Sequence, residues 1–141
     1  GDGSIMTSVS ELATLRDSGL PVVLVVNSND GYLSIRTTRN RYFAGRRIGT
    51  DATNGVLIPP IQNLAAAFEI PYRSAGSKSE LALALDEVTS SAWSGPVVVE
   101  VFTYVDQAIE PIVESRRGDN GEFLTSTLAE MAPDWTDAYE S

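Results

Sequence analysis

Two short runs of apolar, mostly β-branched residues place the strongest constraint on the fold. They occupy residues 21–27 (PVVLVVN) and residues 96–103 (PVVVEVFT). Neither run alternates regularly between polar and apolar side chains, which is typical of strands covered on both faces in a parallel sheet. Segments with helical spacing of apolar residues precede each run. We therefore expect an α/β fold, an open parallel sheet with helices on both faces.

The other elements follow from apolar spacing and from capping signals. Gly19 is expected to cap the C-terminus of the first helix, because glycine readily adopts the left-handed conformation found there. Ser77 and Glu80 have the spacing of a capping box at the start of the last helix. These elements are helices over residues 7–17 and 60–70, a short strand over residues 71–75, and a helix from Ser77 toward Trp93.

Residues 32–59 have no clear period. They contain five arginines between Arg36 and Arg47, followed by a stretch rich in Gly, Asp, Thr, Asn and Pro. We interpret the segment as a long ordered loop, since loops of this length usually carry function or are flexible. The arginines suit three roles: contact with a phosphorylated substrate, contact with a neighbouring subunit, or balance of the acidic surface.

The C-terminal segment, residues 104–141, breaks the alternation of helices and strands. It has scattered prolines and one modest helical candidate at residues 124–131. We expect one domain over residues 1–103 and an irregular C-terminal arm over residues 104–141.

Composition excludes several classes of function. The 141 residues carry 10 Lys and Arg against 19 Asp and Glu, and the net charge of −9 repels nucleic acid and anionic membranes. There is no cysteine and no histidine, so thiolate chemistry and zinc sites built on these residues are excluded. The longest apolar run, residues 22–26, is too short to span a bilayer. We expect a soluble, cytoplasmic protein.

Two polar turns stand at places where an open α/β sheet binds ligands. GDGS opens the chain, and NSNDGY follows the first strand from Asn27. A helix and a returning strand would bring both turns to the carboxyl edge of the sheet. A carboxylate, an amide oxygen and a backbone carbonyl suit Mg²⁺, which completes its octahedron with phosphates and water. The glycines would let a diphosphate approach the backbone.

The pairing of these turns resembles the cofactor signature of thiamine-diphosphate-dependent enzymes. The stretches GDGSIMTSVSELATLRDSGLPVVLVVNSNDGY, LAAAFEIPY and GPVVVEV are similar to the acetolactate-synthase-like branch, including members of surface-polysaccharide and unusual-sugar pathways. The resemblance implies that Mg²⁺ is held by Asp2, Asn29 and the carbonyl of Gly31. It also implies that the diphosphate touches Gly1, Gly3 and Ser4. Ser28 departs from the paired asparagines that are common in the family.

The resemblance further implies that this chain holds half of an active site. It contains the diphosphate-binding domain, whereas the catalytic glutamate that activates the aminopyrimidine belongs to a pyrimidine-binding domain of the same or a partner chain. No catalytic residue is therefore assigned here. A Gly-Asp-Gly turn normally follows a strand, so we expect the chain to be a fragment whose N-terminal strand precedes Gly1. The parent would be a homo-oligomer that decarboxylates pyruvate or a related 2-oxo acid and transfers the two-carbon unit to an acceptor carbonyl.

Other functions stay open at this stage. A simple 2-oxo acid decarboxylase would quench the same carbanion with a proton, and a noncatalytic binding or assembly module could retain the fold. A generic dinucleotide-binding domain is disfavoured, because GDGS lacks the third glycine of the phosphate-binding fingerprint. Glu11 is interpreted as a surface residue of the first helix.

Overall fold

The computed structural model describes residues 1–90, 92–128 and 130–132. The chain forms two compact units, the first from Gly1 to Gln107 and the second beginning at Ala108. Arg36 donates hydrogen bonds to the carbonyl of Val105 and to the carboxylate of Asp106, and these contacts extend the first unit past residue 103.

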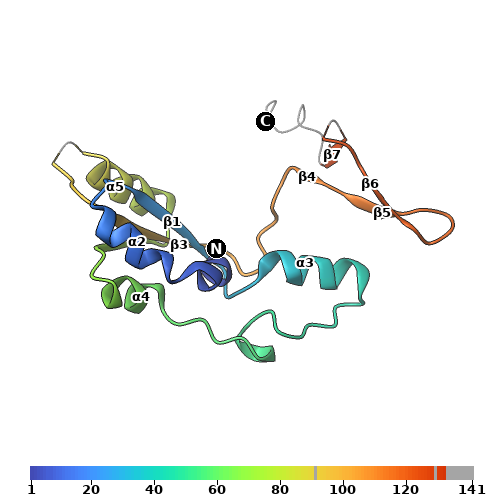
Figure 1. The fold of residues 1–141 in the computed structure, drawn as a ribbon. Coiled ribbons are helices and arrows are strands. Elements are labelled where there is room, and N and C mark those ends of the chain that lie inside the picture. The colour runs from blue at the N-terminus through green and yellow to red at the C-terminus, as the bar shows by residue number, and fades with distance from the viewer. Residues whose placement is uncertain (91, 129, 133–141) are drawn as a thin grey trace. The chain divides into compact units, whose positions relative to one another are not determined.

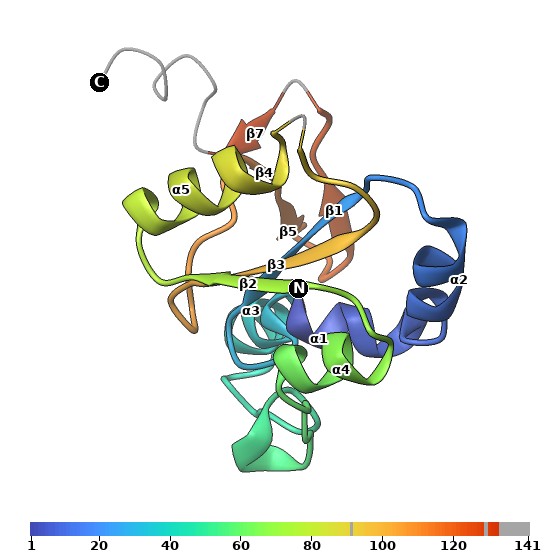
Figure 2. The ribbon, with the colours of Figure 1, turned by 90° about the vertical axis from the view of Figure 1, so that its left-hand side faces the viewer.

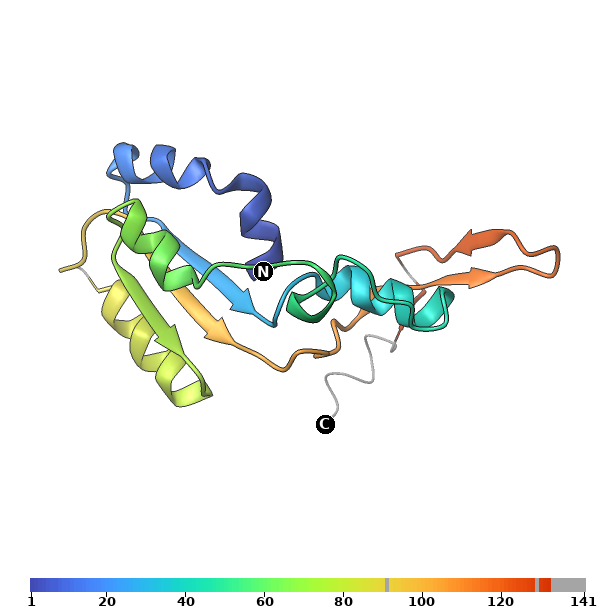
Figure 3. The same cartoon turned by 90° about the horizontal axis from the view of Figure 1, so that it is seen from below.

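The first unit is built on a parallel three-stranded sheet. Its strands are β1 (Val23–Ser28), β2 (Tyr72–Ala75) and β3 (Val97–Phe102), in the order β1-β3-β2 (Figure 3). In the register, Val25 of β1 lies opposite Val99 of β3. The central strand β3 is buried from Val97 to Glu100, as expected for a strand with neighbours on both edges and helices on both faces.

Helices cover the two faces of the sheet (Figures 1 and 2). One face packs against α1 (Asp2–Ile5), α2 (Glu11–Ser18) and α4 (Ile61–Ala67), with a core that includes Leu12, Val26, Ile61, Ala65 and Val98. A 3₁₀ turn, Met6–Ser8, joins α1 to α2. The other face packs against α5 (Lys78–Val88), with a core of Ala84, Val88, Val97 and Val99. The predicted open α/β architecture is confirmed.

The capping predictions are confirmed with one difference. Gly19 ends α2 with φ of 64°, in the left-handed region. The hydroxyl of Ser77 accepts a hydrogen bond from the Glu80 amide at 3.2 Å and begins α5. The Glu80 carboxylate, however, accepts from the amide of Gly76 at 2.7 Å rather than from that of Ser77. The reciprocal half of the capping box is therefore shifted by one residue.

Part of the segment predicted as a loop is helical. Residues Leu33–Tyr42 form α3, and Ala52–Asn54 form a short 3₁₀ turn. The helix α3 has no apolar stripe, because its buried positions are Leu33 and Arg36. Helices are usually recognised from an apolar face, so a helix that buries an arginine escapes a prediction based on hydrophobic period.

The second unit contains short antiparallel strands. The strand β4 (Ile112–Val113) pairs with β7 (Met131–Ala132). The strand β5 (Ser115–Arg117) pairs with β6 (Phe123–Thr125), and the two form the hairpin seen in Figure 3. The helix predicted over residues 124–131 is wrong, and the arm is less irregular than expected. Two- and three-residue strands carry too few residues for the alternation of polar and apolar side chains to be recognised.

None of the helices in the described part of the chain has the length and apolar character required to cross a bilayer.

A buried carboxylate interrupts the apolar sequence of β3. Glu100 is 6% exposed and accepts hydrogen bonds from the hydroxyl groups of Ser28 on β1 and Tyr72 on β2. One carboxylate of the central strand is thereby linked to both neighbouring strands. Burial raises the pKa of Tyr72 to about 12. The hydrogen bond to Glu100 and the negative charge of Glu100 raise this pKa as well.

This network predicts a loss of stability in strong alkali. The phenol of an unfolded chain ionises near pH 10, whereas the folded pKa of Tyr72 is about 12. Its stabilising contribution is therefore complete below about pH 10 and is lost as the pH rises through about 12. Denaturant unfolding from pH 8 upward should show the wild-type free energy falling toward that of Tyr72→Phe above about pH 10. Parallel profiles of the two proteins would contradict the assignment.

Candidate functional site

The start of α1 and the turn after β1 meet at the carboxyl edge of the sheet (Figures 1 and 3). The strand β1 ends at Ser28, and the turn runs from Asn29 to the start of α3 at Leu33. The direct link is a hydrogen bond from the amide of Gly31 to the carboxylate of Asp2, at 3.0 Å. The two polar turns identified in the sequence are therefore in contact.

The carboxylate of Asp2 is the centre of this contact. It is 5% exposed, and its Oδ1 accepts from the amide of Gly3 at 3.0 Å while its Oδ2 accepts from that of Gly31. A carboxylate has about four lone-pair positions, so these two hydrogen bonds leave others free to bind a cation. Asp2 is the first residue of α1 rather than part of a turn.

The side chain of Asn29 and the carbonyl of Gly31 complete a cluster of polar atoms. One terminal atom of the Asn29 amide lies 3.2 Å from Oδ1 of Asp2 and 3.1 Å from the Gly31 carbonyl oxygen. With the amide nitrogen in this position, it donates to both oxygens. With the amide oxygen there, three oxygens converge at the spacing of neighbouring ligands in a Mg²⁺ octahedron, about 3 Å. The donor set therefore fits a hard cation.

The cluster contains a single carboxylate. In the part of the chain that the structure describes, no group of three or more His, Cys, Asp and Glu side chains is arranged to hold a metal. A cation bound by Asp2, Asn29 and Gly31 would need further ligands from elsewhere. Magnesium commonly takes these from water and from substrate phosphates, so the arrangement suits a metal–diphosphate better than a free ion.

Two glycines permit the close approach of the two segments. Gly31 has φ of 114°, and a Cβ there would lie 2.3 Å from the carbonyl oxygen of Thr50. A Cβ on Gly3 would lie 2.8 Å from the ring of Tyr32 and 2.9 Å from the Gly31 carbonyl oxygen. Neither position can take a side chain without displacing backbone or a packed ring.

Residues 50–54, within the segment 32–59 that was predicted as a long ordered loop, support Gly31. The carbonyl of Thr50 accepts from the amide of Tyr32 at 2.8 Å. Asp51 is buried and accepts from the Thr53 amide at 3.0 Å and from the hydroxyls of Thr53 and Thr50. The hydrogen bond from the Thr53 side chain is the main cause of a strongly lowered pKa of Asp51. The spacing of Asp51 and Asn54, a capping box, is the sequence signal for this loop.

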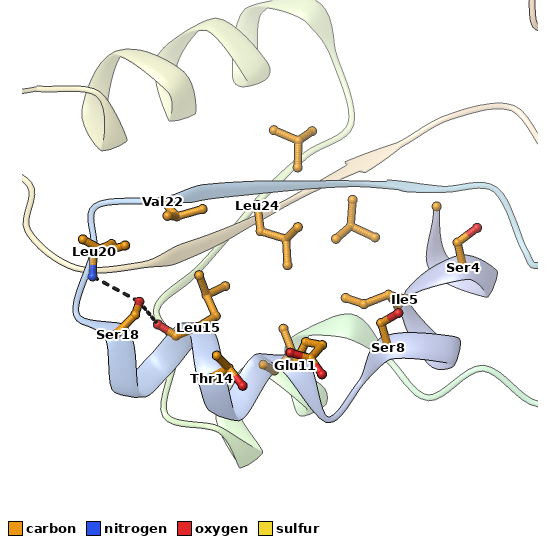
Figure 4. Close-up of a pocket in the computed structure, with 14 residues that line it drawn as sticks. Ser4, Ile5, Ser8, Glu11, Thr14, Leu15, Ser18, Leu20, Val22 and Leu24 are labelled. Carbon is orange, nitrogen blue, oxygen red and sulfur yellow. Dashed lines mark hydrogen bonds between the residues drawn. The ribbon is translucent and has the colours of Figure 1, made fainter.

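Two hollows adjoin the cluster. Asp2 and Asn29 line one of about 330 Å³ at the strand ends, together with Ser28 and Glu100. Gly1 and Ser4 instead line a groove of about 560 Å³ between the first two helices and β1. In Figure 4 the side chains of Ile5, Leu15 and Leu24 point into this groove, which Glu11 also borders.

The predicted site residues are thus only partly brought together. Asp2, Gly3, Asn29 and Gly31 form one cluster through hydrogen bonds and close approaches. Gly1 and Ser4 flank Asp2 and Gly3 in the sequence, but they line the groove between the first two helices and β1. Their contact with a diphosphate stays a prediction.

The structure corrects the interpretation of one arginine. Arg36 has no exposed surface and donates to the carbonyl oxygens of Asn29 and Asp30, each at 2.7 Å. It therefore cannot meet a substrate in solution, and the role in substrate contact suggested for the arginines at 36–47 does not apply to Arg36. Arg47 pairs with Asp106 at 3.5 Å and is partly exposed.

The close approach at Gly31 predicts a large difference between two glycine substitutions. Gly19→Ala places a side chain at positive φ in open space and should cost about 1–2 kcal/mol of unfolding free energy. Gly31→Ala adds a clash with the Thr50 backbone, so it should cost about 1–3 kcal/mol more. Denaturant unfolding of both variants measures the difference. Equal losses would show that Thr50 does not confine Gly31.

Comparison with known proteins identifies the family to which this chain is related. Residues 1–101 match the model of the C-terminal TPP binding domain of thiamine pyrophosphate enzymes. A chloroplastic protein of Oryza sativa subsp. japonica, "Probable acetolactate synthase 2", is 28% identical over 129 residues, covering 87% of this chain and 19% of the relative. The large subunit of acetolactate synthase isozyme 2 from Escherichia coli (strain K12) is 30% identical over 113 residues, covering 80% of this chain and 20% of the relative.

The chain spans about a fifth of the length of these curated relatives. The family match, in contrast, covers the sheet and helices of the first unit and includes all the clustered site residues. The chain therefore belongs to the family of C-terminal TPP binding domains of thiamine pyrophosphate enzymes.

Proposed function

We propose that this chain is the diphosphate-binding domain of a thiamine-diphosphate- and Mg²⁺-dependent, acetolactate-synthase-like carboligase. The observation that carries the proposal is that one terminal atom of the Asn29 amide lies 3.2 Å from Oδ1 of Asp2 and 3.1 Å from the Gly31 carbonyl oxygen. Family membership and the acetolactate synthase relatives support the cofactor and the enzyme class.

The residues of this chain would bind and orient rather than react. Oxygens of Asp2, Asn29 and Gly31 would hold Mg²⁺, and the start of α1 with Gly1, Gly3 and Ser4 would face the diphosphate. The bound cofactor supplies a nucleophilic thiazolium carbon and an electron sink for the decarboxylation of a 2-oxo acid. The chain's contribution is to fix the anionic end of that group, which orients the remainder.

The catalytic glutamate is proposed to come from a pyrimidine-binding domain of the same or a partner chain in a homo-oligomer. Among the described strands, β1 pairs only with β3, so its other edge is available for a further strand. We propose that a further strand of the parent protein adds to this edge and covers part of the apolar groove formed by α1, α2 and β1.

The proposed reaction begins with pyruvate or a related 2-oxo acid and ends with transfer of a two-carbon unit to an acceptor carbonyl, in a cytoplasmic pathway of sugar or surface-polysaccharide synthesis. A simple decarboxylase is the second candidate within the same class. Product analysis with pyruvate, in the presence and absence of an aldehyde or keto-sugar, separates the two: a carboligase gives an adduct, whereas a decarboxylase gives only the aldehyde.

Substitution of the proposed ligands should remove Mg²⁺-supported binding of thiamine diphosphate by the full-length protein. Loss of a residue that only supports a ligand costs about 10–100-fold in metal affinity, so Asp2→Ala and Asn29→Ala should each cost more than about 100-fold. Asp2→Asn keeps one oxygen and should be less severe. Calorimetric titration with the cofactor at fixed Mg²⁺ measures these affinities.

The matched control for this titration is Asp17→Ala, which removes an exposed carboxylate on α2. It should leave the cofactor affinity unchanged. Wild-type affinity in Asp2→Ala, with the same dependence on Mg²⁺, would overturn the metal assignment.

Residues 1–141 alone should release no carbon dioxide from pyruvate, even with saturating Mg²⁺ and thiamine diphosphate. No side chain of this chain is assigned to activate the aminopyrimidine, and the organic part of the cofactor would be unburied, so proximity and activation are both missing. Fusion to the missing domains should restore carbon dioxide release, which a coupled assay detects. Robust turnover by the isolated residues 1–141 would show that the chain contains a complete site.

A further inference from the structure

Arg36 is a fully buried cation beside the turn that carries the proposed metal ligands. Its side chain lies on α3 and has an exposed fraction of 0%. Burial of a guanidinium is costly unless its donors are satisfied and its charge is paired. The donors and the charge of Arg36 must therefore be satisfied by the groups that surround it.

The donors of Arg36 join two separate segments. Nη1 donates to the Asp30 carbonyl at 2.7 Å, and Nη2 donates to the Asn29 carbonyl at 2.7 Å. Nη2 also donates to the carbonyl of Val105, and Nε donates to the carboxylate of Asp106 at 3.2 Å. Because the guanidinium is planar with fixed donor directions, these acceptors are held in a fixed relation to one another.

The two carbonyls of the turn belong to the peptide units that determine where its ligands point. The peptide unit that begins at the Asn29 carbonyl leads into Asp30, whose φ of 61° lies in the left-handed region. That conformation costs an ordinary residue about 1–2 kcal/mol. The next unit ends at the amide of Gly31, which binds Asp2. Hydrogen bonds to both carbonyls therefore stabilise the turn in this left-handed conformation.

We propose that Arg36 is a positioning residue for the metal turn: it presets Asn29 and Gly31 for the cation and couples them to the chain at residues 105–106. This inference rests on the proposed function, because it concerns the same cation site. Arg36 touches neither the cation nor the diphosphate, and it acts through the backbone of the turn. Asp106 also pairs with Arg47 at 3.5 Å, so a second arginine restrains the carboxylate that Arg36 binds.

The test uses Arg36→Met and Arg36→Lys in the full-length protein, with Arg46→Met as the matched control because Arg46 is exposed. Hydrogen exchange of the Gly31 amide is measured without cofactor, and Mg²⁺-dependent thiamine diphosphate affinity is measured by calorimetry. Arg36→Met should accelerate exchange at Gly31 and weaken binding about 10–100-fold, the range for residues that orient metal ligands. Arg36→Lys should recover part of both effects, since a single ammonium satisfies fewer carbonyls. Arg46→Met should change neither.

The outcomes distinguish positioning of the turn by Arg36 from a general effect of the substitution on stability. Lower thermal stability of Arg36→Met, with unchanged Mg²⁺ dependence and unchanged exchange at Gly31, would overturn the inference. If Arg36→Met does not fold, Arg36→Lys and Asp106→Asn supply the same two readouts, and wild-type values in both would overturn it. Failure of the wild type to bind the cofactor would refute the proposed function, whereas the exchange result would still report whether Arg36 fixes the turn.

Discussion

The hydrogen bond from the amide of Gly31 to the carboxylate of Asp2 is the contact on which the candidate site depends. It joins residues 29 positions apart and brings the start of α1 against the turn after β1. The same carboxylate accepts from the amide of Gly3, and its Oδ1 lies 3.2 Å from a terminal atom of the Asn29 amide. Without this contact, each turn would be an ordinary polar connection at a sheet edge.

The contact is maintained by support from three directions. The carbonyl of Thr50 accepts a hydrogen bond from the amide of Tyr32 and lies too close to Gly31 for a side chain to fit there. The hydroxyl of Thr50 in turn donates to the carboxylate of Asp51. Arg36 binds the carbonyls of the two residues that precede Gly31. The sheet supplies the third support, because Ser28 at the end of β1 donates to the buried Glu100 on β3. Rigid placement of ligands by such outer contacts is how proteins tune metal sites.

The parts of this arrangement that the sequence could predict are those governed by periodicity and by the geometry of parallel sheets. The strands at Val23–Ser28 and Val97–Phe102 follow from their apolar runs, and the meeting of Asp2 with the turn at Asn29 follows from their shared sheet edge. The helix α3 was missed because its buried residue is Arg36, a type that is rarely fully buried. The pairing of β5 with β6 was missed because Leu124 lies in a strand too short to show a period.

Whether Asp2, Asn29 and Gly31 hold the cation is tested most directly by a crystal structure. The full-length protein would be crystallised with thiamine diphosphate and with Mn²⁺ in place of Mg²⁺. Anomalous scattering locates the manganese without assumptions about which oxygens bind it. We predict a manganese peak at coordination distance from the Asp2 carboxylate, the Asn29 amide oxygen and the Gly31 carbonyl, with the diphosphate bound to the same ion. An ordered cofactor whose manganese lies elsewhere, with the Asn29 amide nitrogen still donating to Asp2, would contradict it.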